Sequence, residues 1–276
     1  MERFHRLYTN GNKGFKAFLD SQEIPHEYEE SFIGKTVFLL ISESDPNWPL
    51  VSDYLRNFPI SHSVEAKYSK KEIDAAAWCI LGATSHFDYP QPKDDFGYLK
   101  VTYNDGGCSN CGVGYRQIAP FRLRKPPTMR RSQLLQLNWV FDEFFVEQEA
   151  RKQLEASGLT GMEFGDVLLH KSGGFIQNWA QMLVSQTIPP ILETSSLTVE
   201  DCPSCRQIKF NYPRGEQIVL AKPLHETTPD IIKSSEWFGS GGSAHQLVLV
   251  SQRFVQFVRT NNWRGLNLEP VNMPAA

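Results

Sequence analysis

The first hundred residues alternate between apolar runs and amphipathic segments. The run KTVFLLISE at 35–43 predicts a buried strand, and WPLVSDYLRNF at 48–58 predicts a short amphipathic helix behind it. The proline and aspartate spacing of HFDYPQPKDDFG at 86–97 is typical of an exposed loop. We therefore expect an N-terminal α/β subdomain over residues 1–97.

A helix is predicted between that first helix and the loop. Ser69 and Glu72 form a capping box ahead of the Ala-rich segment IDAAAWCILGAT. Cys79 lies inside this segment, and no second cysteine or histidine stands near it in the sequence. We expect Cys79 to be a small buried apolar residue.

A strand, helix, strand order occurs twice in the second part of the chain. The helix former VEQEARKQLEAS stops at Gly158, and Ser251 is a good N-cap for QRFVQFVRT. Strands are predicted around both helices, at LLQLNWVFDEFFV, MEFGDVLLH, HQLVLV and LNLEPV. Together with the N-terminal region, this pattern predicts an α/β fold, with α+β as the alternative.

The two strand, helix, strand units align without a gap. Residues 146–167 placed over 250–271 match Val146 with Val250 and Gly161 with Gly265. They are interpreted as two copies of one unit, or as two α/β units that resemble each other by chance. If they are copies, both glycines lie in equivalent turns, and the helices bury equivalent residues, namely Ala150 and Leu154 in one copy and Phe254 and Val258 in the other.

Composition and charge narrow the class of protein. The chain has 276 residues with 41% hydrophobic and 21% charged residues, a composition typical of globular proteins. A formal charge of -3 creates no global attraction to nucleic acid or anionic lipid. No stretch is apolar enough for a transmembrane helix, and the first residues lack the apolar core of a secretory signal. We expect a cytoplasmic protein that does not bind membranes.

Four of the five cysteines form two CxxC pairs, and each pair lies in a turn. The first is in the Gly-rich NDGGCSNCGVGY and the second in EDCPSCRQ. Two residues between thiolates allow one tight turn to direct both sulfurs at one ion, and two such turns complete a tetrahedral set. The sequence therefore predicts one structural zinc ion held by Cys108, Cys111, Cys202 and Cys205.

Two other uses of these cysteines are weighed against zinc. A redox CxxC opens a helix that lowers the thiol pKa, whereas glycines follow Cys111 and a strand-like segment follows Cys205. Disulfides require an oxidising compartment, and a bridge within either CxxC pair would be strained. Zinc remains the leading interpretation, and a four-thiolate site has no open position for catalysis.

No catalytic motif is present. GxSxG, HExxH, P-loop and GxGxxG patterns do not occur, and the Gly-rich GSGGSAH at 239–245 is interpreted as a flexible surface loop. Asp142 and Glu143 are explained by alternation at a strand end. The histidines show no pair at metal spacing and stand at positions 5, 26, 62, 86, 170, 225 and 245. We expect a protein that is not an enzyme.

Two segments are candidates for contact with a partner. A basic run at 122–131, which includes Arg130 and Arg131, follows the first CxxC turn and either grips phosphate or is a solvated loop. The stretch 172–190 carries Trp179, which is either a partner contact or a core anchor. The basic run supports an alternative function as a nucleic-acid-binding module.

The CxxC turns, the segment LNWVFDEFFVEQEARKQLEASGLTG and the closing LVLVSQRFVQFVRTNNWRGLNLEPV together resemble the double-CXXCG proteins, a paralogous family first noticed in myxobacteria. The resemblance covers roughly residues 98–271, so we expect a second domain, 98–276, that is stapled by zinc. It implies that the four cysteines are paired metal ligands. Arg206 stands where the family has glycine, which affects the second turn.

Some double-CXXCG proteins are immunity proteins. The resemblance therefore implies a non-catalytic, zinc-binding immunity protein that neutralises a cognate polymorphic toxin by direct binding. The mild negative charge suits a basic toxin.

Overall fold

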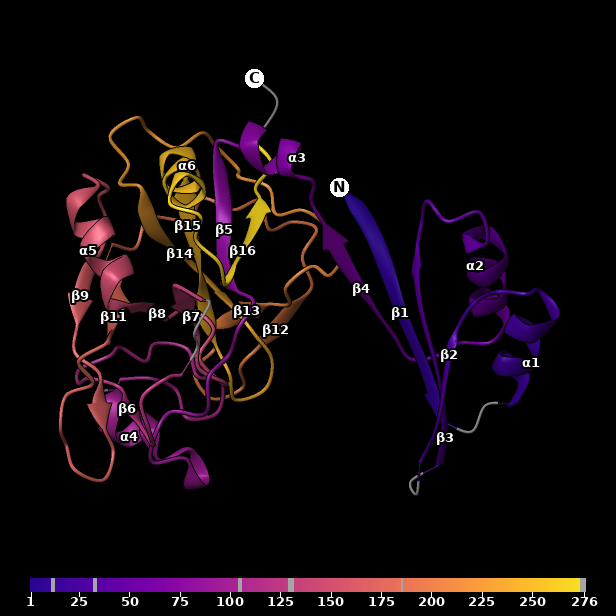
Figure 1. Ribbon diagram of the computed structural model, residues 1–276, viewed down its shortest axis with the longest axis horizontal. Helices are drawn as coiled ribbons and strands as arrows, with labels where there is room; N and C mark the ends of the chain where they lie inside the picture. Colours follow the sequence, from indigo (N-terminus) through magenta and orange to yellow (C-terminus); the bar gives the residue numbers. More distant parts are fainter. Residues whose placement is uncertain (11–12, 32–33, 104–105, 129–131, 185, 274–276) are drawn as a thin grey trace. The chain divides into compact units, whose positions relative to one another are not determined.

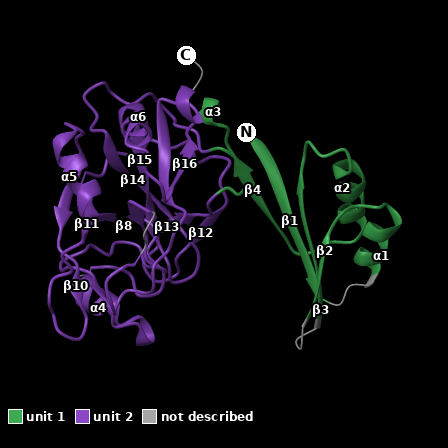
Figure 2. Ribbon diagram, in the orientation of Figure 1, with its two compact units in different colours: residues 1–72, 213–217 green, residues 73–212, 218–276 purple. Residues whose placement is uncertain are grey.

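The computed structural model describes residues 1–10, 13–31, 34–103, 106–128, 132–184 and 186–273. The chain divides into two compact units (Figure 2). Unit 1 comprises residues 1–72 and 213–217, and unit 2 comprises 73–212 and 218–276. The division falls earlier than the predicted boundary after residue 97, because the segment that follows residue 72 supplies a central strand of unit 2. No helix in these described ranges is long and apolar enough to cross a membrane.

Unit 1 is a four-stranded antiparallel sheet in the order β2-β3-β1-β4, with two helices. Its core joins Leu7 and Leu39 of the sheet to Phe15 and Val51 of the helices. The predicted strand at 35–43 is confirmed but is buried on one face only, because its alternate residue Leu40 is exposed. The elements are β1 (Glu2–Asn10), α1 (Lys13–Ser21), β2 (Glu27–Ser31), β3 (Gly34–Ser42), α2 (Trp48–Asn57) and β4 (His62–Lys67).

The predicted helix through Cys79 is wrong. The capping box of Ser69 and Glu72 forms and starts α3 (Lys70–Ala75), but the chain then continues as β5 (Trp78–Ala83). Strand β5 lies between β15 and β16, and its pairing with both neighbours outweighs the helical preference of its alanines. Cys79 is fully buried in this strand, as expected of a small apolar residue.

Unit 2 combines helices with mixed sheets, so the predicted α/β fold class is confirmed (Figure 1). Its largest sheet has the order β12-β13-β14-β15-β5-β16, and a second sheet has the order β7-β8-β11-β9. The remaining elements are α4 (Tyr98–Thr102), β6 (Arg122–Leu123), β7 (Leu134–Leu135), β8 (Phe144–Glu147), α5 (Gln148–Ala156), β9 (Glu163–Gly165), β10 (Leu168–Leu169), β11 (Trp179–Leu183), β12 (Val199–Asp201), β13 (Ile208–Phe210), β14 (Ile231–Phe238), β15 (His245–Ser251), α6 (Gln252–Thr260) and β16 (Leu266–Pro270).

The predicted pair of related units is present in unit 2. Helix α5 follows β8 with Glu147 as its N-cap, and α6 follows β15 with Ser251 as its N-cap. The turn glycines Gly161 and Gly265 both have left-handed backbones, with φ of +95° and +91°. The four predicted helix residues are buried in one shared core, namely Ala150, Leu154, Phe254 and Val258.

The correspondence extends beyond these units to four strands on each side. The orders β7-β8-β11-β9 and β14-β15-β5-β16 correspond strand for strand. Ala180 pairs with Val146 in one sheet, and Cys79 pairs with the equivalent Val250 in the other. Strand β5 precedes the first unit in the chain but lies in the sheet of the second, and β11 precedes the second unit but lies in the sheet of the first.

Candidate metal centre

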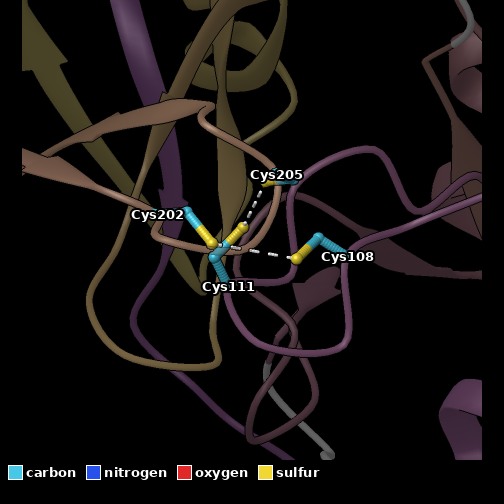
Figure 3. Close-up of side chains that lie close together, drawn as sticks. All are labelled: Cys108, Cys111, Cys202 and Cys205. Carbon is cyan, nitrogen blue, oxygen red and sulfur yellow. Dashed lines mark hydrogen bonds between the residues drawn. The ribbon is translucent and has the colours of Figure 1, made fainter.

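The two CxxC turns meet within unit 2, although 94 residues separate their matching positions. The Sγ atoms of Cys108 and Cys202 lie 3.8 Å apart, and those of Cys111 and Cys205 lie 3.5 Å apart (Figure 3). All four sulfurs are within 4.8 Å of one another. Sulfurs at the corners of a tetrahedron with metal–sulfur bonds of about 2.3 Å are about 3.8 Å apart. The four cysteines are thus positioned to hold a metal ion.

The turns share one backbone geometry. In the first, Gly112 N–H donates to the Cys108 carbonyl at 2.7 Å, and in the second, Arg206 N–H donates to the Cys202 carbonyl at 2.9 Å. Both donor residues have a left-handed backbone, with φ of +79° for Gly112 and +59° for Arg206. Arg206 therefore adopts the conformation that the expected glycine would adopt, and the second turn is preserved.

Only in the first turn does another segment, 242–244, lie so close that the position requires glycine. A Cβ on Gly112 would lie 2.8 Å from the Gly242 carbonyl oxygen and 2.9 Å from the Ala244 nitrogen. The Arg206 side chain is exposed. A side chain therefore fits at position 206, whereas one at position 112 would collide with the backbone of 242–244.

Backbone amides stabilise two of the thiolates. The N–H groups of Cys205 and Ser204 donate to the Cys202 sulfur and lower its pKa to about 6. The N–H groups of Asn110 and Cys111 lower the pKa of Cys108 in the same way. Both turns therefore provide one sulfur that favours the deprotonated form, which is the form that binds metal.

Burial has the opposite effect on Cys111. It raises the pKa of this thiol to about 12, because a buried thiolate is poorly solvated when no cation is nearby. Cys111 and Cys202 form a small apolar cluster with Val113, and Trp237 and Ala244 pack against it. A bound cation would supply the positive charge that this buried set of sulfurs requires.

The segment 239–245 is exposed at 240–243, as expected of a surface loop, but hydrogen bonds hold it beside the cysteines. The fully buried side chain of Lys209 donates to the carbonyls of Gly241 at 2.6 Å and Ser243 at 3.2 Å. Glu200 accepts from the Gly241 N–H at 3.1 Å. The sequence shows the glycines but not the lysine that holds them, since Lys209 is 30 residues before the loop in a strand of its own.

The geometry does not match the two other uses of the cysteines. All four cysteines are free thiols, and the sulfur separations of 3.5 and 3.8 Å between the two turns are far longer than the roughly 2.05 Å of a disulfide bond. Neither CxxC turn is followed by a helix: turns follow Cys111, and β13 follows Cys205, as expected. A redox motif at a helix N-terminus is therefore not formed.

The structure describes only some of the residues that were predicted to contact a partner. Trp179 is only 3% exposed and belongs to β11, in a core cluster with Phe121 and Phe145, so its interpretation as a core anchor is confirmed and the alternative of a partner contact is wrong. Arg130 and Arg131 lie outside the described residues. Of the basic run, Arg124 is paired with Asp88 at 3.1 Å. Nucleic-acid binding by this run stays a prediction.

A buried ionic group lies apart from the cysteines. Lys233 donates to Glu143 at 2.6 Å, and Gln181 donates to the other oxygen of Glu143 at 2.8 Å. Asp142 lies 3.5 Å from the same lysine. Burial raises the pKa of Glu143, but the facing lysine opposes this, so the group is a satisfied structural ion pair. The alternation of apolar and polar residues at this strand end accounts for Glu143 without revealing that Lys233 is its partner.

Comparison with known proteins adds no relative. The chain matches no protein-family model and no curated protein.

Proposed function

We propose that Cys108, Cys111, Cys202 and Cys205 bind one structural zinc ion. The convergence of four sulfurs from two matching turns supports this proposal. Tetrahedral sites with four thiolates favour zinc or iron–sulfur centres, and a mononuclear set of this size suits zinc. All four positions are taken by the protein, so the ion would stabilise the fold and would not activate water.

The experiment measures the metal content of the full chain. Zinc close to one per chain is expected for the purified protein, and Cys108→Ser or Cys202→Ser lowers it strongly. Cys79→Ala is the matched control, because this cysteine is buried in β5 away from the four ligands. Zinc retained after both ligand substitutions, or iron in place of zinc, contradicts the proposal.

We propose further that the protein is a cytoplasmic, non-catalytic immunity protein that neutralises a cognate toxin by direct binding. The closed cysteine site supports a stabilising role for the metal and leaves the surface for partner binding. The cysteines are free thiols, which suits a reducing compartment. The resemblance to double-CXXCG proteins, some of which are immunity proteins, gives the class of partner.

Co-expression tests the immunity function. The chain is expressed together with the toxin encoded beside its gene, and cell survival is measured. Survival that depends on the chain, with a complex recovered from the lysate, is expected. A toxin that kills equally in its presence, and that forms no complex with the purified protein, refutes the immunity function.

A further inference from the structure

Unit 2 displays an aromatic cluster that the cysteine site does not use. The ring of Trp139 lies 4.4 Å from that of Tyr89 and 4.6 Å from that of Phe96, measured between centroids. The side chain of Phe96 is 52% exposed. These three residues, from the loop before α4 and the connection between β7 and β8, are called the aromatic cluster below (Figure 1).

A cation already occupies the face of this cluster. The ammonium of Lys93 lies 4.2 Å from the Tyr89 ring centroid and 5.9 Å from that of Trp139. Both distances are within the range of cation–π attraction. Lys93 is exposed, so a positive group from another molecule can compete for the same ring faces.

Backbone strain is concentrated at the cluster. Among the described residues, seven non-glycine residues have positive φ, and four of them belong to these two loops. Trp139 has φ of +69° and Phe96 has φ of +52°. Bulky residues rarely adopt this conformation, and such strain is retained mainly at binding or catalytic positions. The four residues are Asp88, Asp95, Phe96 and Trp139.

The acidic residues beside the cluster favour a positively charged ligand. Asp94 and Asp95 form the turn that carries Phe96, and both are exposed. Carboxylates beside aromatic faces attract cations and repel phosphate. Base stacking by a nucleic acid would bring phosphates close to these acids, so the cluster does not suit nucleic acid.

We propose that the aromatic cluster, with Asp94 and Asp95, binds a lysine or arginine side chain of a protein partner, which displaces Lys93. Tryptophan and tyrosine are among the residues that most often carry the affinity at interfaces, and in the cluster Trp139 and Tyr89 are half-buried beside the exposed Phe96. The proposal rests on the proposed function for the identity of the partner, which would be a toxin with a basic surface. It replaces Trp179 by Trp139 as the tryptophan of the contact surface.

The first test uses small probes and the full chain. The protein is labelled with 5-fluorotryptophan, and the resonance of Trp139 is assigned by its loss in Trp139→Phe. N-acetyl-arginine amide and N-acetyl-lysine amide are titrated, with N-acetyl-norleucine amide as the uncharged control. Saturable shifts of Trp139 with the basic probes only are expected. The resonance of Trp263, whose ring nitrogen donates to Gln153, serves as the internal control.

Two variants set the expected size of the effect. Lys93→Gln removes the competing cation, and a cation–π contact of ordinary strength predicts about two- to fivefold tighter probe binding. The double variant Asp94→Asn, Asp95→Asn is expected to bind the basic probes more weakly, because both carboxylates are removed. No shift of Trp139 in either the wild type or Lys93→Gln overturns the proposal, and so does an equal shift with the norleucine probe.

The second test separates this surface from the immunity function. Phe96→Ser is compared with Phe175→Ser, because both remove an exposed phenylalanine of unit 2. Weaker toxin binding and less neutralisation by Phe96→Ser alone are expected. Equal neutralisation by both variants refutes the surface and leaves the immunity function intact. Binding of the basic probes without binding of any toxin refutes the immunity function and leaves the surface intact.

Discussion

Adding one methyl group at Gly161 tests the duplicated architecture of unit 2. A Cβ on Gly161 would lie 2.0 Å from the carbonyl oxygen of Ile231, which starts β14. The matching Gly265 faces Leu134 of β7 in the same way, at 2.5 Å. Each glycine therefore lets its turn touch the strand that begins the other copy's sheet. Gly158 is the control, because it has φ of +70° and a Cβ added there would meet no atom within 4 Å.

The expected loss follows from the contacts. Alanine in a left-handed backbone costs about 1–2 kcal/mol, so Gly158→Ala should lower the free energy of unfolding by about that amount or less. In Gly161→Ala the facing strand must also retreat by more than about 1 Å to restore ordinary separations. That movement disrupts the bond from Ile231 N–H to the Thr160 carbonyl and the bonds from Thr160 to Asp230. At about 1 kcal/mol for each of these three hydrogen bonds, the total is about 4–5 kcal/mol.

Urea unfolding followed by tryptophan fluorescence measures these losses. Trp48 belongs to unit 1, and the other five of the six tryptophans belong to unit 2, so the signal reports mainly on the duplicated unit. Gly161→Ala and Gly265→Ala should show similar, large decreases in the free energy of unfolding. The control Gly158→Ala shows the cost of the left-handed backbone alone. If the decreases for Gly161→Ala and Gly265→Ala are within about 1 kcal/mol of the decrease for Gly158→Ala, contact between the glycine turns and the facing strands does not stabilise unit 2, and the reasoning is wrong.

Three further predictions use single groups. Burial raises the pKa of Cys79 to about 12, so a thiol reagent at about pH 8 should leave Cys79 unmodified after chelation of the metal and modify it only after unfolding, whereas Cys202, whose pKa is lowered to about 6, should react in the folded, metal-free chain. Lys209→Met should speed hydrogen exchange across 239–244 and hasten metal release, with no change at β5 as the control. Lys233→Met should cost about 3–5 kcal/mol by leaving Glu143 buried without a cation, and Glu143→Leu in the same chain should recover most of it in urea unfolding.

The sequence was sufficient for the candidate metal site and for the local units around it. Two CxxC turns carry their chemistry in four consecutive residues, so their meeting could be expected from ligand count alone. The helices α5 and α6 were also predictable, because apolar spacing fixes which face is buried. Both predictions concern patterns that are complete within about ten residues.

The positions of β5 and β11 in the sheets were not predictable in this way. The Ala-rich segment around Cys79 favours a helix locally, and only pairing with β15 and β16 makes it a strand. The choice between the two interpretations of Trp179 was open for the same reason, because its neighbours Gly173 and Gly174 suggest a loop while its pairing with Glu147 places it in a sheet. Such pairings join residues far apart in the chain, and no short window of sequence contains them.

The two copies differ in the connection that precedes β8 and β15. In the first copy, the link from β7 to β8 carries Trp139 to the aromatic cluster. In the second, the link from β14 to β15 is the Gly-rich stretch that Lys209 holds against the cysteines. The strands on both sides of these links correspond, so the scaffold is shared and the links are free to diverge. One link therefore covers the candidate metal site, and the other supplies the surface that we assign to a basic partner.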